Sequence, residues 1–210
     1  MASKSAIRPE PEELVAFAVG SGVVAAAFTA FTADFSPENI AFYAGAAALA
    51  LLVREAGQRV TATFMNANTR LELSGRGSLS SLAVAAFSSV AQIPLLFPVP
   101  VESEFSQVKY EEWGKSTDAM WMKRKAWLAG SGIAALLGSY AVLLVLDLSK
   151  LADTLAVFTA FQMAPLDPEG NVSDIIVMPT GTLDGAYILR LSPWYWMILA
   201  GLSLVALATT

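Results

Sequence analysis

Long apolar runs constrain this chain more than any other feature of its sequence, because they are too long for the ordinary core helices of a soluble protein. Hydrophobic residues make up 55% of the 210 residues, and charged residues only 15%. The candidate segments are Leu14–Ala33, Ile40–Val53, Leu79–Val99, Trp127–Leu146, Leu151–Met163 and Trp194–Ala208. We therefore predict an all-α polytopic membrane protein with about five to six transmembrane or re-entrant segments, the shorter ones tilted or partly inserted.

The polar stretches between these runs are short, so the pattern predicts a single membrane domain over residues 1–210. A polar tail covers residues 1–13, a cytoplasmic basic loop residues 100–125, and a Pro/Gly-rich loop residues 164–192. Two stretches, TRLELSGRG (69–77) and FSQVKY (105–110), alternate apolar and polar side chains as short strands do. We expect them to form β-like stretches between the second and fourth segments.

Basic residues predict the topology, since cytoplasmic loops carry the excess of Lys and Arg. Lys4 and Arg8 precede the first segment, the turn at 34–39 has no basic residue, and the stretch 54–76 holds four arginines. A multi-pass protein of the cell membrane with a cytoplasmic N-terminus is predicted. The segment Leu79–Val99 is rich in serine, has prolines near its end and precedes a second basic loop. A re-entrant excursion fits these features better than a full crossing.

The chain contains no cysteine and no histidine. Disulfides, thiolate nucleophiles, imidazole bases and every metal site built on these two residue types are therefore excluded. The net charge of −5 and the lack of a basic stripe with interleaved aromatic residues argue against a nucleic-acid partner.

Three segments at the edges of apolar runs carry a further signal: REAGQ (54–58), RKAWLAGSGIA (124–134) and PTGTLDGAYIL (179–189). In this order they resemble the site-2 protease family of intramembrane zinc metalloproteases. That family has HExxH on a helix, then a GKxALAGPxxN-like stretch, then a Pro-rich loop that ends in LDG. The matching residues are Glu55 and Gly57 in the first motif, Lys125, Ala126, Leu128, Ala129 and Gly130 in the second, and Pro179, Leu183, Asp184 and Gly185 in the third.

The sequence departs from this pattern at the positions of the zinc ligands. The resemblance implies a zinc ion held by two histidines and the LDG aspartate, but Arg54 and Gln58 stand at the histidine positions. Arginine offers no lone pair, and a neutral amide is a poor zinc ligand, so only Asp184 remains. Glu55, the general base that the resemblance implies, then has no metal-bound water to activate. The second motif has Ser131 and Ala134 where the family has proline and asparagine.

We therefore expect no metal, no other cofactor and no protease activity, and we interpret Arg54 as a fixed positive charge in place of the zinc. It would neutralise Asp184, Glu55 or both, with Gln58 adding a hydrogen bond on the same helix face. The alternative is that Arg54 marks the cytoplasmic end of a membrane span and reaches into the lipid headgroups.

The function that this resemblance implies is that of a degenerate relative: a scaffold or subunit of a larger membrane complex, able to grip a transmembrane segment of a partner. Its partners would be membrane lipid and other membrane protein subunits. The alternative is a small ion or solute transporter or channel component that uses intramembrane Arg54, Glu55 and Asp184.

Two other clusters of polar residues are not predicted to form a functional site. Glu10, Glu12 and Glu13 are predicted to be the acidic first turn of a helix, which the helix dipole favours. Asp167, Glu169, Asn171 and Asp174 have a calcium-loop composition without the spacing of an EF-hand, which predicts a solvated loop.

Overall fold

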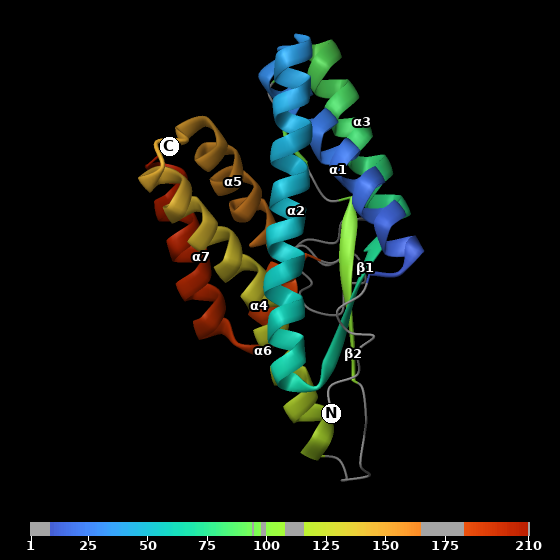
Figure 1. Cartoon of the computed structure of the whole chain (residues 1–210), viewed down its shortest axis with the longest axis vertical. Coiled ribbons are helices and arrows are strands. Elements are labelled where there is room, and N and C mark those ends of the chain that lie inside the picture. The colour runs from blue at the N-terminus through green and yellow to red at the C-terminus, as the bar shows by residue number, and fades with distance from the viewer. Residues whose placement is uncertain (1–8, 94, 98–99, 108–115, 165–182, 210) are drawn as a thin grey trace.

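Helices dominate the described part of the chain, and a short two-stranded ribbon interrupts them (Figure 1). The computed structural model describes residues 9–93, 95–97, 100–107, 116–164 and 183–209. The elements are α1 (Pro11–Thr32), α2 (Pro37–Met65), β1 (Ala67–Leu73), α3 (Gly75–Ala91), β2 (Val101–Gln107), α4 (Ser116–Val145), α5 (Ser149–Gln162), α6 (Asp184–Leu191) and α7 (Pro193–Ala208). The prediction of a mostly helical chain with a small β component between its second and fourth segments is confirmed.

Three of the described helices are long and apolar enough to cross a membrane. They are α1, α2 and the part of α4 from Lys123 to Val145, while α7 is apolar but shorter. They support the prediction that the chain is a membrane protein with transmembrane helices.

Helix α2 is much longer than the apolar run Ile40–Val53 that predicted it, since it begins at Pro37 and ends at Met65. Ser36 caps its start by accepting a hydrogen bond from the backbone N–H of Asn39, and Asn66, in the left-handed conformation, ends it. The helix passes through Arg54 without a break, because Arg, Glu, Ala and Gln are all good helix formers. Arg54 thus lies well inside a helix and not at its end.

The two strands form an antiparallel ribbon with one buried and one exposed face. Their register pairs Leu71 with Ser103 and Arg70 with Glu104. Leu71, Ser103 and Phe105 are buried on the inner face. The alternation in TRLELSGRG predicted β1, which ends at Leu73 because Ser74 already caps α3 through the N–H of Gly77. The stretch FSQVKY predicted only the end of β2, which begins at Val101.

Helix α3 leaves the ribbon and the chain returns to it. Leu73, at the end of β1, is paired with Val101, at the start of β2, and the Ser74 N–H donates to the Pro100 carbonyl at 2.9 Å. In Figure 1, α3 runs alongside α1, which it contacts. Entry and exit of the segment around Leu79–Val99 therefore lie next to each other, the geometry that a re-entrant excursion requires.

Two segments that were predicted to be loops contain helices or a strand. The basic loop predicted over 100–125 contains β2 and the beginning of α4, which starts at Ser116 and not at Trp127. The Pro/Gly-rich loop predicted over 164–192 contains α6, whose strongly amphipathic sequence DGAYILRL favours a helix. Lys109, Lys115 and the calcium-like residues Asp167, Glu169, Asn171 and Asp174 lie outside the described residues.

Helix α2 is the centre of the fold. Figure 1 shows it between α1 and α3 on one side and α4, α5 and α7 on the other, and it packs against both α1 and α4. A buried apolar cluster around Leu51, Leu136 and Phe158 joins these two halves. Because α2 contacts both halves, charged side chains in its middle are enclosed on two sides.

Candidate functional site

A buried ion pair links the middle of α2 to the start of α6. Arg54 Nε lies 2.6 Å from Asp184 Oδ2, and Arg54 Nη2 lies 2.7 Å from Asp184 Oδ1. Both side chains are only 1% exposed. This two-pronged geometry is the strong form of the arginine–carboxylate interaction. The predicted charge pair is confirmed, and the alternative of Arg54 as a headgroup anchor is wrong because its guanidinium is enclosed by protein.

Gln58 and Ser103 extend the pair into a chain of hydrogen bonds. The Gln58 amide Nε2 lies 3.3 Å from each Asp184 carboxylate oxygen, and its Oε1 accepts a hydrogen bond from Ser103 Oγ at 2.8 Å. Arg54 and Gln58 are four residues apart, so they lie on the same face of α2. Asp184 therefore receives donors from both side chains, and the network joins α2, α6 and β2.

The local sequence LDG fixes the position of the Asp184 carboxylate. Asp184 is the first residue of α6, where the helix dipole favours a negative charge. The next residue, Gly185, lies directly against the backbone of Met163 at the end of α5, and a Cβ at Gly185 would collide with the Met163 carbonyl. Glycine is thus needed there for close approach, which sets the depth at which Asp184 enters the site.

The second motif supplies the surface against which Arg54 and Gln58 pack. A Cβ added at Gly132 of α4 would lie 3.0 Å from Arg54 Cγ and 3.0 Å from Gln58 Nε2. Gly57 of α2 is still closer to α4, since a Cβ there would lie 2.7 Å from the Ser131 carbonyl oxygen. Ser131 Oγ also donates to the Gly57 carbonyl at 3.2 Å. The helices carrying the first two motifs therefore cross in close contact beside the ion pair.

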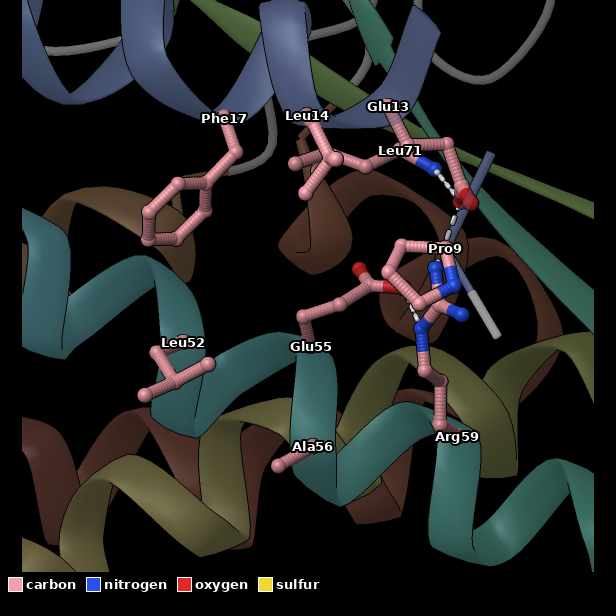
Figure 2. A pocket seen from close by; sticks show the side chains of 9 residues that line it. All are labelled: Pro9, Glu13, Leu14, Phe17, Leu52, Glu55, Ala56, Arg59 and Leu71. Carbon is pink, nitrogen blue, oxygen red and sulfur yellow. Dashed lines mark hydrogen bonds and ion pairs between the residues drawn. The ribbon is translucent and has the colours of Figure 1, made fainter. Parts of the chain in front are cut away.

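Glu55 belongs to a different network, on the face of α2 toward α1 (Figure 2). Its Oε1 accepts hydrogen bonds from Arg59 Nε at 2.8 Å and from Thr69 Oγ1 at 3.3 Å. Arg59 Nη2 in turn lies 2.5 Å from Glu13 Oε1. Of the two carboxylates considered as partners of Arg54, the contact is thus with Asp184 and not with Glu55.

The acidic first turn of α1 has a second role that its sequence did not predict. Glu13 accepts the Glu10 N–H at 2.7 Å in a capping box, as expected of an acidic helix start. Its other oxygen, Oε1, binds Arg59 and accepts the Leu71 N–H at 3.1 Å. The sequence analysis missed Arg59 and Ser103. The four-residue spacing of Glu55 and Arg59 was the available signal for the first, and the inward register of Ser103 in an alternating strand for the second.

These residues do not fit a zinc ion. Arg54 has no lone pair to donate to a metal, and both oxygens of Asp184 are engaged by the guanidinium and the Gln58 amide. In the described part of the chain no three Asp or Glu residues gather closely enough to hold a metal. Pro179, the remaining residue of the third motif, lies outside the described residues.

Chemically, the arrangement is suited to holding α2, α4 and α6 together. A bidentate pair with an added amide donor leaves neither carboxylate oxygen without a donor, so the charge is stabilised in place. The contact joins residues 130 positions apart in the chain. Compared with known proteins, the chain matches no family model, no curated protein and no solved structure.

Proposed function

We propose that this chain is a non-catalytic, site-2-protease-like membrane protein that acts as a scaffold or subunit of a larger membrane complex. The contact between Arg54 and Asp184 carries the proposal. A guanidinium lies against the aspartate where the resemblance implies a metal ion, and Gln58 donates to the same carboxylate from the position of the second histidine. The charged side chains of Arg54 and Asp184 thus bind each other inside the protein and do not activate a water molecule for hydrolysis.

Two further contacts support a retained architecture with altered chemistry. Gly132 and Gly57 keep α4 and α2 in close contact at the former site. Glu55, the residue at the general-base position, binds Arg59 and Thr69 instead of facing Asp184. A protein of this kind contributes surfaces to its partners and carries out no bond cleavage of its own.

Variants of the ion pair test whether partner binding requires only the folded structure or the charges of Arg54 and Asp184 themselves. The double variant Arg54→Met with Asp184→Asn removes both charges while leaving neutral side chains of similar length, and such replacements are often close to neutral for folding. If the chain is a scaffold, the double variant should co-purify with the same membrane subunits as the native chain in mild detergent. The single variant Arg54→Met, which leaves a buried carboxylate unpaired, should lose them together with its stability.

Reconstitution in liposomes provides the contrary outcome. A chain that purifies alone and conducts ions or solutes, with conduction abolished in the folded double variant, would contradict the scaffold proposal in favour of transport. Cleavage of membrane peptides by the native chain would contradict it as well.

A further inference from the structure

A second site lies on the face of α2 toward α1, apart from the Arg54–Asp184 pair. Helices α1 and α2 and strand β1 line a partly open cavity of about 300 Å³. Figure 2 shows Leu14 and Phe17 of α1 facing Leu52 of α2 across it, and Ala56 also lines the cavity. Its walls are therefore mostly apolar, and its size is at the lower end of the range of about 300–1,000 Å³ that is common for ligand pockets.

One carboxylate oxygen in this cavity has no partner. Glu55 is 8% exposed, and its Oε1 is engaged by Arg59 and Thr69. Its Oε2 is buried and accepts no hydrogen bond from any described residue. In Figure 2 this oxygen points away from Arg59, toward α1 and into the space between the helices. A buried carboxylate oxygen without a donor is costly, so a donor brought by a ligand would be bound favourably.

The charges in the wall specify the sign of that ligand. Glu13 and Glu55 share the single guanidinium of Arg59, with contacts of 2.5 and 2.8 Å. Two carboxylates and one guanidinium give this group a net charge of −1. A monocation that donates a hydrogen bond would both neutralise the group and satisfy Oε2.

The same wall argues against a metal ion as the ligand. Calcium takes about six to eight oxygen ligands and zinc about four donors, whereas this cavity offers one free carboxylate oxygen among apolar side chains. A primary ammonium has three donors, of which one would bind Glu55 Oε2 and the others would face the open side of the cavity. An apolar stem attached to it would fill the space beside Leu14, Phe17 and Leu52.

We propose that this cavity binds a small amphiphilic amine, with its primary ammonium on Glu55 Oε2 and its apolar stem between α1 and α2. The site is independent of the proposed scaffold function, since it shares no contact with the Arg54–Asp184 pair.

The test measures the thermal midpoint of the full chain in detergent while n-hexylamine is added, with n-hexanol and n-hexanoate as probes of equal length and different charge. Binding to the folded state alone raises the midpoint, because it stabilises that state by RT ln(1 + L/Kd), where L is the free ligand concentration. The amine should raise it, and the alcohol and the acid should bind about tenfold more weakly or not at all. Equal effects of the amine and the alcohol would overturn the proposal.

Variants decide whether the cavity is responsible. Glu55→Gln should abolish the advantage of the amine, whereas Glu104→Gln, which removes the same charge from an exposed strand position, should retain it. Leu14→Trp at the mouth of the cavity should block binding without touching the carboxylate. Val15→Trp is its matched control, because Val15 is similarly exposed, at 59% against 56%, and does not line the cavity.

Each variant result bears directly on the proposal. Retained amine binding in folded Glu55→Gln, or in Leu14→Trp if the first variant does not fold, would show that the amine acts elsewhere. Loss of binding in Glu104→Gln or Val15→Trp would show the same, because neither residue contacts the cavity.

Discussion

Gly132 of α4 packs directly against Arg54 of α2, with space for no side chain between them: a Cβ at Gly132 would lie 3.0 Å from Arg54 Cγ and 3.1 Å from Gln58 Cγ. The glycine therefore leaves room for the Arg54 and Gln58 side chains against α4. A methyl group at this position has to displace Arg54, Gln58 or the helix itself.

We expect Gly132→Ala to destabilise the fold by about 1–3 kcal/mol, the usual range for overpacking. The control is Gly138→Ala on the same helix, where a Cβ would meet nothing within 4 Å. It should be neutral or stabilise by up to about 1 kcal/mol, as alanine does in a helix interior. Chemical unfolding in detergent measures both. If the two variants behave alike, the close packing at Gly132 has no energetic consequence.

The Arg54–Asp184 pair should couple strongly in a double-mutant cycle. Arg54→Met and Asp184→Asn should each cost about 3–5 kcal/mol, because either one leaves a buried polar group without its partner. The double variant should recover much of the loss, so the two effects are not additive. Arg70→Met is the control: Arg70 pairs with Glu12 at the surface, and such pairs contribute about 0–1 kcal/mol. Additive effects of the two buried changes would contradict the pair.

The exposed face of the ribbon should make stability depend on pH. Burial raises the pKa of Glu72 above its ordinary value of 4.5, and the neighbouring Glu104 and Glu102 raise it further, while Arg70 opposes them. Because the pKa is higher in the folded state than in the unfolded state, ionised Glu72 destabilises the fold at neutral pH. This penalty is relieved as the pH falls through the raised pKa and is absent below about 4.5.

Glu72→Gln should therefore stabilise the chain at pH 7 by less than about 1 kcal/mol, the range for like charges opposite each other on neighbouring strands. The gain should disappear at pH 4. Thermal unfolding at the two pH values measures it. Glu12→Gln, which removes a partner of Arg70, should give no gain at pH 7. A constant effect of Glu72→Gln at both pH values would mean that its titration is not responsible.

Local patterns in the sequence predicted the helical class, β1 and the end of β2, and the resemblance to the site-2 protease family predicted the Arg54–Asp184 pair. The pair could be predicted because the order of REAGQ, AGSG and LDG carried information about three-dimensional proximity that no single segment contains. Hydrophobicity failed at the helix ends: α2 continues to Met65 although its apolar run stops at Val53. Polar residues that are buried between helices end an apolar run in the sequence, so the sequence wrongly indicates that a loop begins there.

The sequence held signals for the inward side of Ser103 and for the contact of Arg59 with Glu55, but it could not predict their partners Gln58 and Glu13. Ser103 reaches Gln58 only because β2 pairs with β1 in a register that turns it inward. Arg59 meets Glu13 only because α1 packs across α2 at that level. Both contacts depend on tertiary arrangement, which the sequence of either segment does not specify.

The topology gives a prediction that labelling can decide. Asp34, in the turn between α1 and α2, and Glu104, on β2, are both exposed, and the turn has no basic residue, whereas the stretch 54–76 has four. By the excess of positive charge inside, Asp34 should be external and Glu104 cytoplasmic. Since the chain has no cysteine, single Asp34→Cys and Glu104→Cys variants can be labelled with an impermeant maleimide.

In intact cells only Asp34→Cys should react, and Glu104→Cys should react after permeabilisation. Arg70→Cys should behave as Glu104→Cys does, because the two residues are paired in the ribbon. External labelling of Glu104→Cys together with protection of Arg70→Cys would mean that the segment around α3 crosses the membrane.

Histidines at positions 54 and 58 should convert the site into a zinc site. Arg54 and Gln58 both contact Asp184 from one face of α2, so imidazoles at these positions would direct nitrogen donors toward the same carboxylate. Two histidines and one carboxylate with an open fourth position are a common zinc ligand set. The native chain should contain no stoichiometric zinc, because its two side chains on α2 cannot ligate the metal.

We expect about one zinc per chain in Arg54→His with Gln58→His, measured by elemental analysis, and a higher thermal midpoint when zinc is present. Adding Asp184→Asn to the double variant should remove the zinc, since the third ligand is lost. The matched control places histidines at Glu55 and Arg59, which are also four residues apart on α2 but face the other network. Zinc bound equally by that control, or absent from the double variant, would contradict the inference that Arg54 and Gln58 stand at zinc-ligand positions around Asp184.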